Sequence, residues 1–91
     1  MQYFLSKNFE KQFRKLSKKI KDRALEKLRL FTTNPRDRHL NNHHLAGEWT
    51  GYRSIDITAD IRAVYKEMNK DKDGTNIVRF DSIGSHSELY E

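Results

Sequence analysis

Asp60-Ile61-Arg62-Ala63-Val64-Tyr65-Lys66 is the stretch of sequence that decides the fold. It is apolar on both faces near its middle, which is typical of a central strand, and we extend that strand over residues 61–68. Residues 49–58 precede it and end in strict alternation of isoleucine with polar residues, which indicates a half-buried strand. Residues 76–83 predict a third strand after an Asp-Gly turn within residues 69–74. The pattern predicts a three-strand antiparallel meander.

The first third of the chain predicts a strand and helices. Residues 2–5 are aromatic and apolar and indicate a strand along or beside the sheet edge, after which Ser6 can cap a helix. Apolar residues then recur at helical spacing as far as Phe31, with Ser17 as a break that permits two helices instead of one. Asn34-Pro35 ends the helical pattern, and residues 34–48 read as loop. We therefore expect one α+β domain over residues 1–91, with helices packed on one face of the sheet and the other face free for a ligand.

Charge divides the chain into two halves. The net charge is +5, with twelve Lys or Arg against four acids in residues 1–38 and six against nine in residues 39–91. A basic half can hold a polyanion without reading its sequence, although a Lys-rich helix face can also be merely solvated. The chain has no cysteine, and we find neither an apolar run long enough for a membrane span nor a signal-peptide core. These features predict a soluble cytoplasmic protein with no membrane partner.

Antiparallel pairing places side chains once the turn centres are set. A bend centred near Ala59 puts Asp56 opposite Arg62, and a turn centred near Lys72 puts Arg62 opposite Ser82, with Asp60 at the rim. A guanidinium in such a row can hold two phosphate oxygens and stabilise the charge of phosphoryl transfer. The simpler alternative is an Asp-Arg pair that only steadies the sheet.

The chain after the third strand supplies candidate chemistry. Ser85-His86-Ser87-Glu88 fits a capping box, so a helical turn begins there. The imidazole of His86 can donate or accept a proton near neutral pH, and Tyr90 lies one turn further on, where it could stack on a base or cover the core. His39, His43 and His44 lie in a segment of loop composition with no evident third metal ligand, so we predict no metal site and no cofactor.

The motifs resemble those of a known toxin family. His43 to Arg53 reads HHLAGEWTGYR and is followed by Asp60 to Lys66, Arg79-Phe80 and GSHSELY at residues 84–90. This order resembles the YafQ branch of the RelE/ParE toxin superfamily over about half the chain. The resemblance implies a RelE-like fold and a bacterial type II toxin. It implies a metal-independent, ribosome-dependent endoribonuclease that cuts mRNA in the A site, inhibits translation and is silenced by a cognate antitoxin.

The resemblance also assigns roles. His86, Asp60 and His43 match catalytic positions: His86 would protonate the leaving 5′ oxygen, and Asp60 or His43 would take the 2′-hydroxyl proton. Arg62 matches the strand arginine of the RelE and YoeB branches and would bear the phosphate charge. Tyr90 would orient the nucleotide, and the Lys-rich helices would grip ribosomal RNA. Asp56 and Arg53 complete the expected substrate-binding set.

Two positions depart from the YafQ pattern. Asp56 stands where a histidine is usual, and Ser82 where an arginine is usual. Because Ser82 is expected opposite Arg62, we hypothesise that the guanidinium has moved across one strand pair. Two other functions stay open: a ParE-like toxin that poisons DNA gyrase, and a degenerate member that only binds its antitoxin. An acidic, partly disordered antitoxin is the expected partner in each case.

Overall fold

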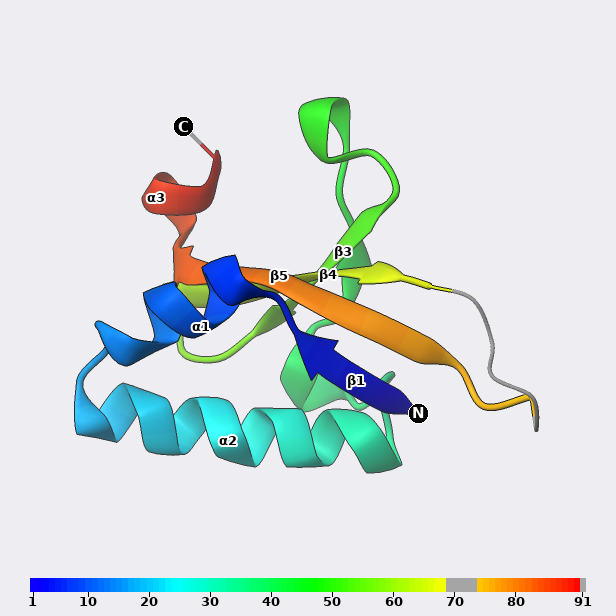
Figure 1. Cartoon of the computed structure of the whole chain (residues 1–91), viewed down its shortest axis with the longest axis horizontal. Coiled ribbons are helices and arrows are strands. Elements are labelled where there is room, and N and C mark those ends of the chain that lie inside the picture. Colours follow the sequence, from blue (N-terminus) through cyan, green and yellow to red (C-terminus); the bar gives the residue numbers. More distant parts are fainter. Residues whose placement is uncertain (69–73, 91) are drawn as a thin grey trace.

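A computed structural model describes residues 1–68 and 74–90, except for the side chain of Tyr90. The strands are β1 (Gln2–Leu5), β2 (His43–His44), β3 (Tyr52–Asp56), β4 (Ile61–Glu67) and β5 (Ile77–Ser85). The helices are α1 (Lys7–Arg14), α2 (Lys18–Thr33) and the short α3 (His86–Tyr90), with 3₁₀ turns η1 (Arg38–Leu40) and η2 (Gly47–Trp49). The strands form one sheet in the order β1-β5-β4-β3-β2 (Figure 1). The predicted α+β fold is confirmed, and most of the predicted Asp-Gly turn lies outside the described residues.

Serine caps explain why the first third forms two helices. The side chain of Ser6 accepts a hydrogen bond from Phe9 N–H at 3.0 Å, and that of Ser17 accepts one from Ile20 N–H at 3.3 Å. Each bond satisfies one of the free N–H groups of a helix start. The helix α2 ends at Thr33, one residue before Asn34, as expected ahead of a proline. The break predicted at Ser17 is thus confirmed.

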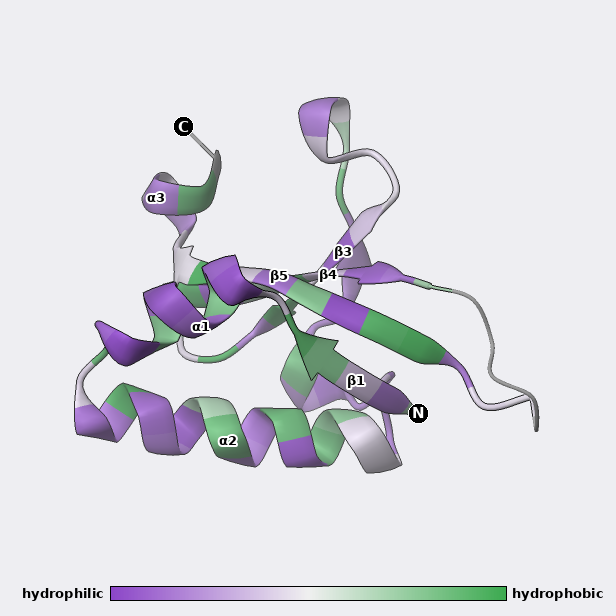
Figure 2. Cartoon of the chain, viewed as in Figure 1, coloured by the Kyte–Doolittle hydropathy of each residue, from purple (hydrophilic) through white to green (hydrophobic). Residues whose placement is uncertain are grey.

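The core lies between α2 and one face of the sheet. Phe31 of α2 meets Tyr65 of β4 and Phe80 of β5 edge to face, with ring centroids 5.0 and 5.2 Å apart. Phe9 packs against Phe80 at 5.9 Å, and all four of these rings are buried. Figure 2 shows α2 as alternating hydrophobic and hydrophilic bands, the pattern of a helix with one face on a sheet. No helix in residues 1–68 and 74–90 is long and apolar enough to cross a membrane.

The edge of β5 is covered in two ways. The strand β1 pairs with β5 in parallel, but only along residues 77–80. Beyond this point α1 and its cap satisfy the backbone of β5: Asn8 Nδ2 donates to the Asp81 carbonyl at 2.9 Å, and Gln12 Oε1 accepts from Ile83 N–H at 2.8 Å. The part of the β5 edge that β1 does not cover therefore has few unpaired backbone groups.

The strand register confirms one predicted pairing and corrects another. Asp56 pairs with Arg62, as a bend near Ala59 predicts. Arg62, however, lies opposite Gly84, and Ser82 lies opposite Val64, so the prediction that Ser82 faces Arg62 is wrong. The difference is two residues: Tyr65 pairs with Phe80, which is one residue away from the register of a turn centred at Lys72, and the bulge between Val64 and Tyr65 adds the second. The hypothesis that the guanidinium moved directly across from Ser82 falls with that pairing.

The segment predicted as loop, residues 34–48, contains regular structure. It includes η1, the start of η2 and the two-residue strand β2, which pairs with β3 through His43–Ser54 and His44–Arg53. Such a short strand carries no period that the sequence could show. Its pairing fixes the side chains of the two adjacent histidines on opposite faces of the sheet.

Candidate functional site

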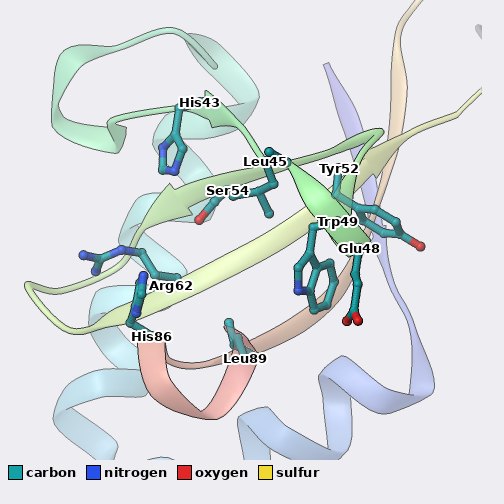
Figure 3. A pocket seen from close by; sticks show the side chains of 10 residues that line it. His43, Leu45, Glu48, Trp49, Tyr52, Ser54, Arg62, His86 and Leu89 are labelled. Atoms are coloured by element: carbon teal, nitrogen blue, oxygen red, sulfur yellow. The ribbon is translucent and has the colours of Figure 1, made fainter. Parts of the chain in front are cut away.

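A hollow of about 760 Å³ lies on the sheet face opposite α2. Its walls are α3 and the segment of residues 45–51, which both stand up from that face (Figure 1). Its lining residues are His43, Leu45, Ala46, Glu48, Trp49, Tyr52, Ser54, Arg62, His86 and Leu89. We call His43, Arg62 and His86 the phosphate end, and Glu48, Trp49 and Tyr52 the aromatic end, because Figure 3 shows the two groups at opposite ends of the hollow.

Arg62 is held on two of its three guanidinium nitrogens. Its Nε lies 2.9 Å from Asp56 Oδ1 in an ion pair, and its Nη1 donates to the Thr58 carbonyl at 2.9 Å. Among the described residues, no partner takes a hydrogen bond from Nη2. Gly84 lies opposite Arg62 and has no side chain to fill the space beside it. The guanidinium is thus fixed in position and keeps donors for an anion.

His86 is placed by the start of α3. Ser85 N–H donates to Glu88 Oε1 at 2.9 Å and Glu88 N–H donates to Ser85 Oγ at 3.1 Å, so the predicted capping box is confirmed. The hydrogen bond from the Ser85 backbone N–H lowers the pKa of the Glu88 carboxyl below its ordinary value, and the Ser85 side chain adds a smaller effect in the same direction. His86 N–H donates to the Asp60 carbonyl at 3.1 Å, which ties α3 to the bend between β3 and β4.

The helix α3 lies close to the sheet because Gly84 is beneath it. A Cβ atom on Gly84 would come within 3.4 Å of Glu88 Oε1 and 3.6 Å of Leu89 Cδ2. These are ordinary contact distances to side-chain atoms, so a Cβ atom fits, and a larger side chain would have to displace the side chains of Glu88 and Leu89. Gly84 therefore lies directly against the side chains of α3.

Asn41 joins His43 to the Asp56–Arg62 pair. The His43 ring nitrogen Nδ1 lies 2.8 Å from the Asn41 carbonyl oxygen, and Asn41 Nδ2 donates to Asp56 Oδ2 at 3.3 Å. A carbonyl oxygen only accepts, so Nδ1 carries a proton and the neutral ring presents Nε2 as an acceptor. Asn41 adopts a left-handed conformation with φ 47°, which asparagine tolerates better than most residues. No periodic pattern in the sequence indicates this role of Asn41.

Arg53 lies on the opposite face of the sheet, away from the hollow. It is buried, its Nε donates to Asn42 Oδ1 at 2.7 Å, and its Nη1 lies 2.7 Å from His44 Nε2. Because arginine is always protonated, His44 Nε2 must accept this bond. Asn42 in turn donates to the Tyr65 hydroxyl at 2.7 Å, and burial raises the pKa of Tyr65. Arg53 thus belongs to a buried polar network and is not among the residues that line the hollow.

The remaining predicted residues lie in different places. Asp60 is exposed, and its side chain does not line the hollow, although its carbonyl holds α3. Tyr90 is the last residue of α3, and its side chain is outside the described part of the structure. His39 belongs to η1, pairs with Asp37 and is not among the residues that line the hollow. Among the described residues, no three potential metal ligands gather in one group.

The sequence reasoning missed the aromatic end. Trp49 and Tyr52 meet edge to face with centroids 5.4 Å apart, and Lys66 Nζ lies 5.7 Å from the Tyr52 ring centroid. Gly47 and Gly51 bracket Trp49 with φ of 65° and 94°, conformations that favour glycine. The two glycines that flank Trp49 were the available signal, and the alternation of β3 already placed Tyr52 on the same face as Asp56.

Solved structures with this fold define the class of protein. The YafQ structure from E. coli strain BL21(DE3) matches with a TM-score of 0.78 and 24% identity, over 98% of this chain and 97% of that one. The YoeB/ParE toxin from Agrobacterium tumefaciens matches with a TM-score of 0.75 and 17% identity, over 94% and 99%. The E. coli DinJ–YafQ toxin–antitoxin complex matches with a TM-score of 0.73 and 27% identity, over 98% and 96%. The fold is that of the RelE/ParE class of small toxins.

The family follows from the sequence model. The model described as a bacterial toxin of type II toxin–antitoxin system, YafQ, matches residues 1–91. The chain belongs to the YafQ family of type II toxins. A comparison with curated protein sequences finds no match.

Proposed function

We propose that this toxin is a metal-independent, ribosome-dependent endoribonuclease that cuts mRNA in the A site and so stops translation. One observation carries the proposal: Arg62, His43 and His86 line one hollow, with the guanidinium fixed and still able to donate. A fixed cation beside two imidazoles supplies charge stabilisation and proton transfer from the protein's own side chains. The reaction acts on ribosomes, so the bacterial cytoplasm is its proposed location.

The proposed reaction is an in-line transfer of the phosphodiester. The 2′ oxygen attacks the adjacent phosphorus, the bond from phosphorus to the 5′ oxygen breaks, and the products are a 2′,3′-cyclic phosphate and a 5′ hydroxyl. His43 Nε2 takes the 2′-hydroxyl proton, and His86 gives a proton to the leaving 5′ oxygen. Arg62 donates to the phosphate oxygens as their charge grows. Atoms and charge balance without a further reactant.

The remaining predicted residues take positioning roles in this proposal. Asp56 orients the Arg62 guanidinium, and the Asp60 carbonyl holds the start of α3 and hence His86. The structure favours His43 over Asp60 as the base, because His43 lines the hollow and the Asp60 side chain does not. Tyr90 is retained as the residue that orients the nucleotide, on the strength of the motif alone.

The charge distribution supports a ribosomal substrate. Most of the twelve basic residues of the first 38 belong to α1, α2 and the turn between them. The helix α2 lies on the sheet face opposite the hollow, so RNA in the hollow would leave α2 free to contact a second RNA surface (Figure 1). In the ribosome that surface is ribosomal RNA, held through phosphates and weakened by salt.

We propose a cognate antitoxin as the protein partner. The DinJ–YafQ structure is a toxin–antitoxin complex, and its toxin has the same fold. An acidic, partly disordered antitoxin suits the basic surface, because such segments wrap a partner and fold as they bind.

Induced expression with and without the antitoxin tests this function. A translated reporter message should gain new 5′ ends, and the same message without a start codon should stay intact. Chelation of divalent ions should leave cutting by purified toxin on preassembled ribosomes unchanged in rate, provided the ribosomes stay intact. A 2′-deoxy nucleotide at the cut site should abolish it. Intact messages combined with inhibited gyrase supercoiling would favour a ParE-like poison, and antitoxin binding with neither effect would favour a degenerate member.

A further inference from the structure

The backbone of Asn41 turns its carbonyl oxygen toward the His43 ring. Asn41 is the C-cap of η1 and has φ 47° and ψ 49°, which lie in the left-handed region. Its carbonyl oxygen lies 2.8 Å from His43 Nδ1, two residues further along the chain. The direction of a carbonyl group follows from the backbone angles of its own residue. The hydrogen bond to His43 therefore depends on the left-handed conformation of Asn41.

Contacts on both sides hold Asn41 in this conformation. Its backbone N–H donates to the Arg38 carbonyl at 3.2 Å, and its side-chain Nδ2 donates to Asp56 Oδ2 at 3.3 Å. Leu40, directly before it, is fully buried. Asparagine also enters the left-handed region at less cost than most residues with a side chain. Asn41 is therefore a fixed acceptor beside His43.

The partner of Nδ1 decides which nitrogen of the His43 ring carries the proton. A neutral histidine side chain in water favours the tautomer with the proton on Nε2, in which Nε2 is a donor. A carbonyl oxygen accepts only from a protonated Nδ1, so the Asn41 carbonyl favours the other tautomer. In that tautomer Nε2 is the unprotonated nitrogen. Figure 3 shows the His43 ring reaching from β2 into the hollow.

We propose that Asn41 is the positioning residue that makes His43 a general base. Its left-handed backbone selects the Nδ1–H tautomer and so leaves an unprotonated Nε2 for the 2′-hydroxyl proton. This inference rests on the proposed function and deepens it, because it states what prepares His43 to accept a proton. Asn41 acts through His43 and needs no contact with the substrate.

Two substitutions separate the backbone of Asn41 from its side chain. Asn41→Gly loses the amide but adopts the left-handed conformation readily, so it should keep the Nδ1–H tautomer and cut within about threefold of the wild-type rate. Asn41→Val places a β-branched residue there, and its strain exceeds what one exposed hydrogen bond can hold. The carbonyl should turn away, His43 should shift toward the Nε2–H tautomer, and the maximal rate should fall about ten- to hundredfold. Asn41→Ala is a milder form of the same change.

Nitrogen NMR of the imidazole rings measures the tautomer directly. At alkaline pH the rings are neutral, and a protonated ring nitrogen and an unprotonated one have well-separated ¹⁵N shifts. His43→Gln identifies the His43 signals among those of the four histidines. A merely structural role of Asn41 would lower the free energy of unfolding in urea without changing the tautomer.

Cutting is measured on preassembled ribosomes over a range of toxin concentrations. Asn41→Val should lower the maximal rate and leave the half-saturating concentration unchanged, because a base moves a proton and does not hold the message. Asn76→Val is the matched control, since Asn76 is exposed, has no positive φ and does not line the hollow. It should change neither the tautomer nor the rate.

The outcomes separate this inference from the proposed function. An Nε2–H tautomer of His43 in the wild-type protein would overturn the inference. Equal losses in Asn41→Gly and Asn41→Val would also overturn it, since the effect would then come from the side chain. Cutting that Asn41→Val leaves at the wild-type rate would overturn it and keep the nuclease. A tautomer shift in Asn41→Val, with no message cut by the wild type, would sink the nuclease and leave the hold of Asn41 on His43 standing.

Discussion

Arg62→Ala removes the fixed cation of the phosphate end. Loss of one preorganised donor to a developing oxyanion typically costs about a hundred- to thousandfold in rate, or about 3–4 kcal/mol of transition-state stabilisation. We expect a loss of cutting in that range or beyond, because the guanidinium brings a full charge as well as donors. Lysine at this position should recover only part of the rate, since it keeps the charge without the planar fork.

The same substitution should cost little stability. The side chains of Arg62 and Asp56 are 19% and 26% exposed, and the pair is therefore partly screened by solvent. Asp56 also keeps its hydrogen bond from Asn41 Nδ2 after the change. We expect the free energy of unfolding to fall by about 1 kcal/mol or less. The fall in cleavage rate should therefore be much larger than the small increase in the unfolded fraction can explain.

Arg79→Ala is the matched control for this prediction. Arg79 also pairs with an aspartate, donating from Nη2 to Asp81 Oδ2 at 3.0 Å, but it does not line the hollow. Cleavage is measured by primer extension on ribosome-bound message, and stability by urea unfolding of the same samples. Wild-type cutting by Arg62→Ala, or an equal loss in Arg79→Ala, would refute the assignment of Arg62 to the phosphate.

Four further predictions concern residues of α3, β3 and β5. His86→Gln should lower cutting about a hundred- to ten-thousandfold with α3 retained by far-UV dichroism, because the backbone bond to the Asp60 carbonyl survives. Gly84→Ala should be tolerated, whereas Gly84→Val should displace α3 and lower the rate about a hundredfold in the same assay without loss of the urea transition. Arg53→Met should lower the free energy of unfolding by about 1–3 kcal/mol, since its buried partners lose a donor, while the rate per folded molecule stays unchanged. The lowered pKa of Glu88 means that its charged form stabilises α3: the contribution is complete above the ordinary value of 4.5 and is lost as the pH falls through the folded value, so acid unfolding of Glu88→Gln should lack this component.

Local chemistry made much of the fold predictable. Ser6 and Ser17 marked helix starts because their hydroxyls can accept the free N–H groups, and both bonds are present. The alternation of Ile55 with Asp56 placed one inward and the other on the hollow's face. A tight bend then left little choice for the pairing of Asp56 with Arg62. Each of these inferences needs only neighbours in sequence.

The errors arose where distant parts of the chain decide the outcome. The bulge between Val64 and Tyr65 accounts for one of the two residues by which Ser82 departs from its predicted pairing, and a single extra residue leaves no mark in the sequence. The strand β2 exists only because β3 lies beside it. The predicted role of Arg53 in substrate binding came from its place in the motif. The alternation that buries Ile55 also places Arg53 on the inner face of the sheet, and this pattern was already visible in the sequence.

The pairing of β1 with β5 determines when the sheet can close as the chain is synthesised. Ser6, directly after β1, binds the Asp81 carbonyl across 75 positions of sequence. As the chain emerges from the ribosome, β1 therefore cannot pair until β5 has been synthesised. His86 follows that late strand, so the candidate site is among the last features to take shape, and a prematurely terminated product would lack both the closed sheet and the histidine.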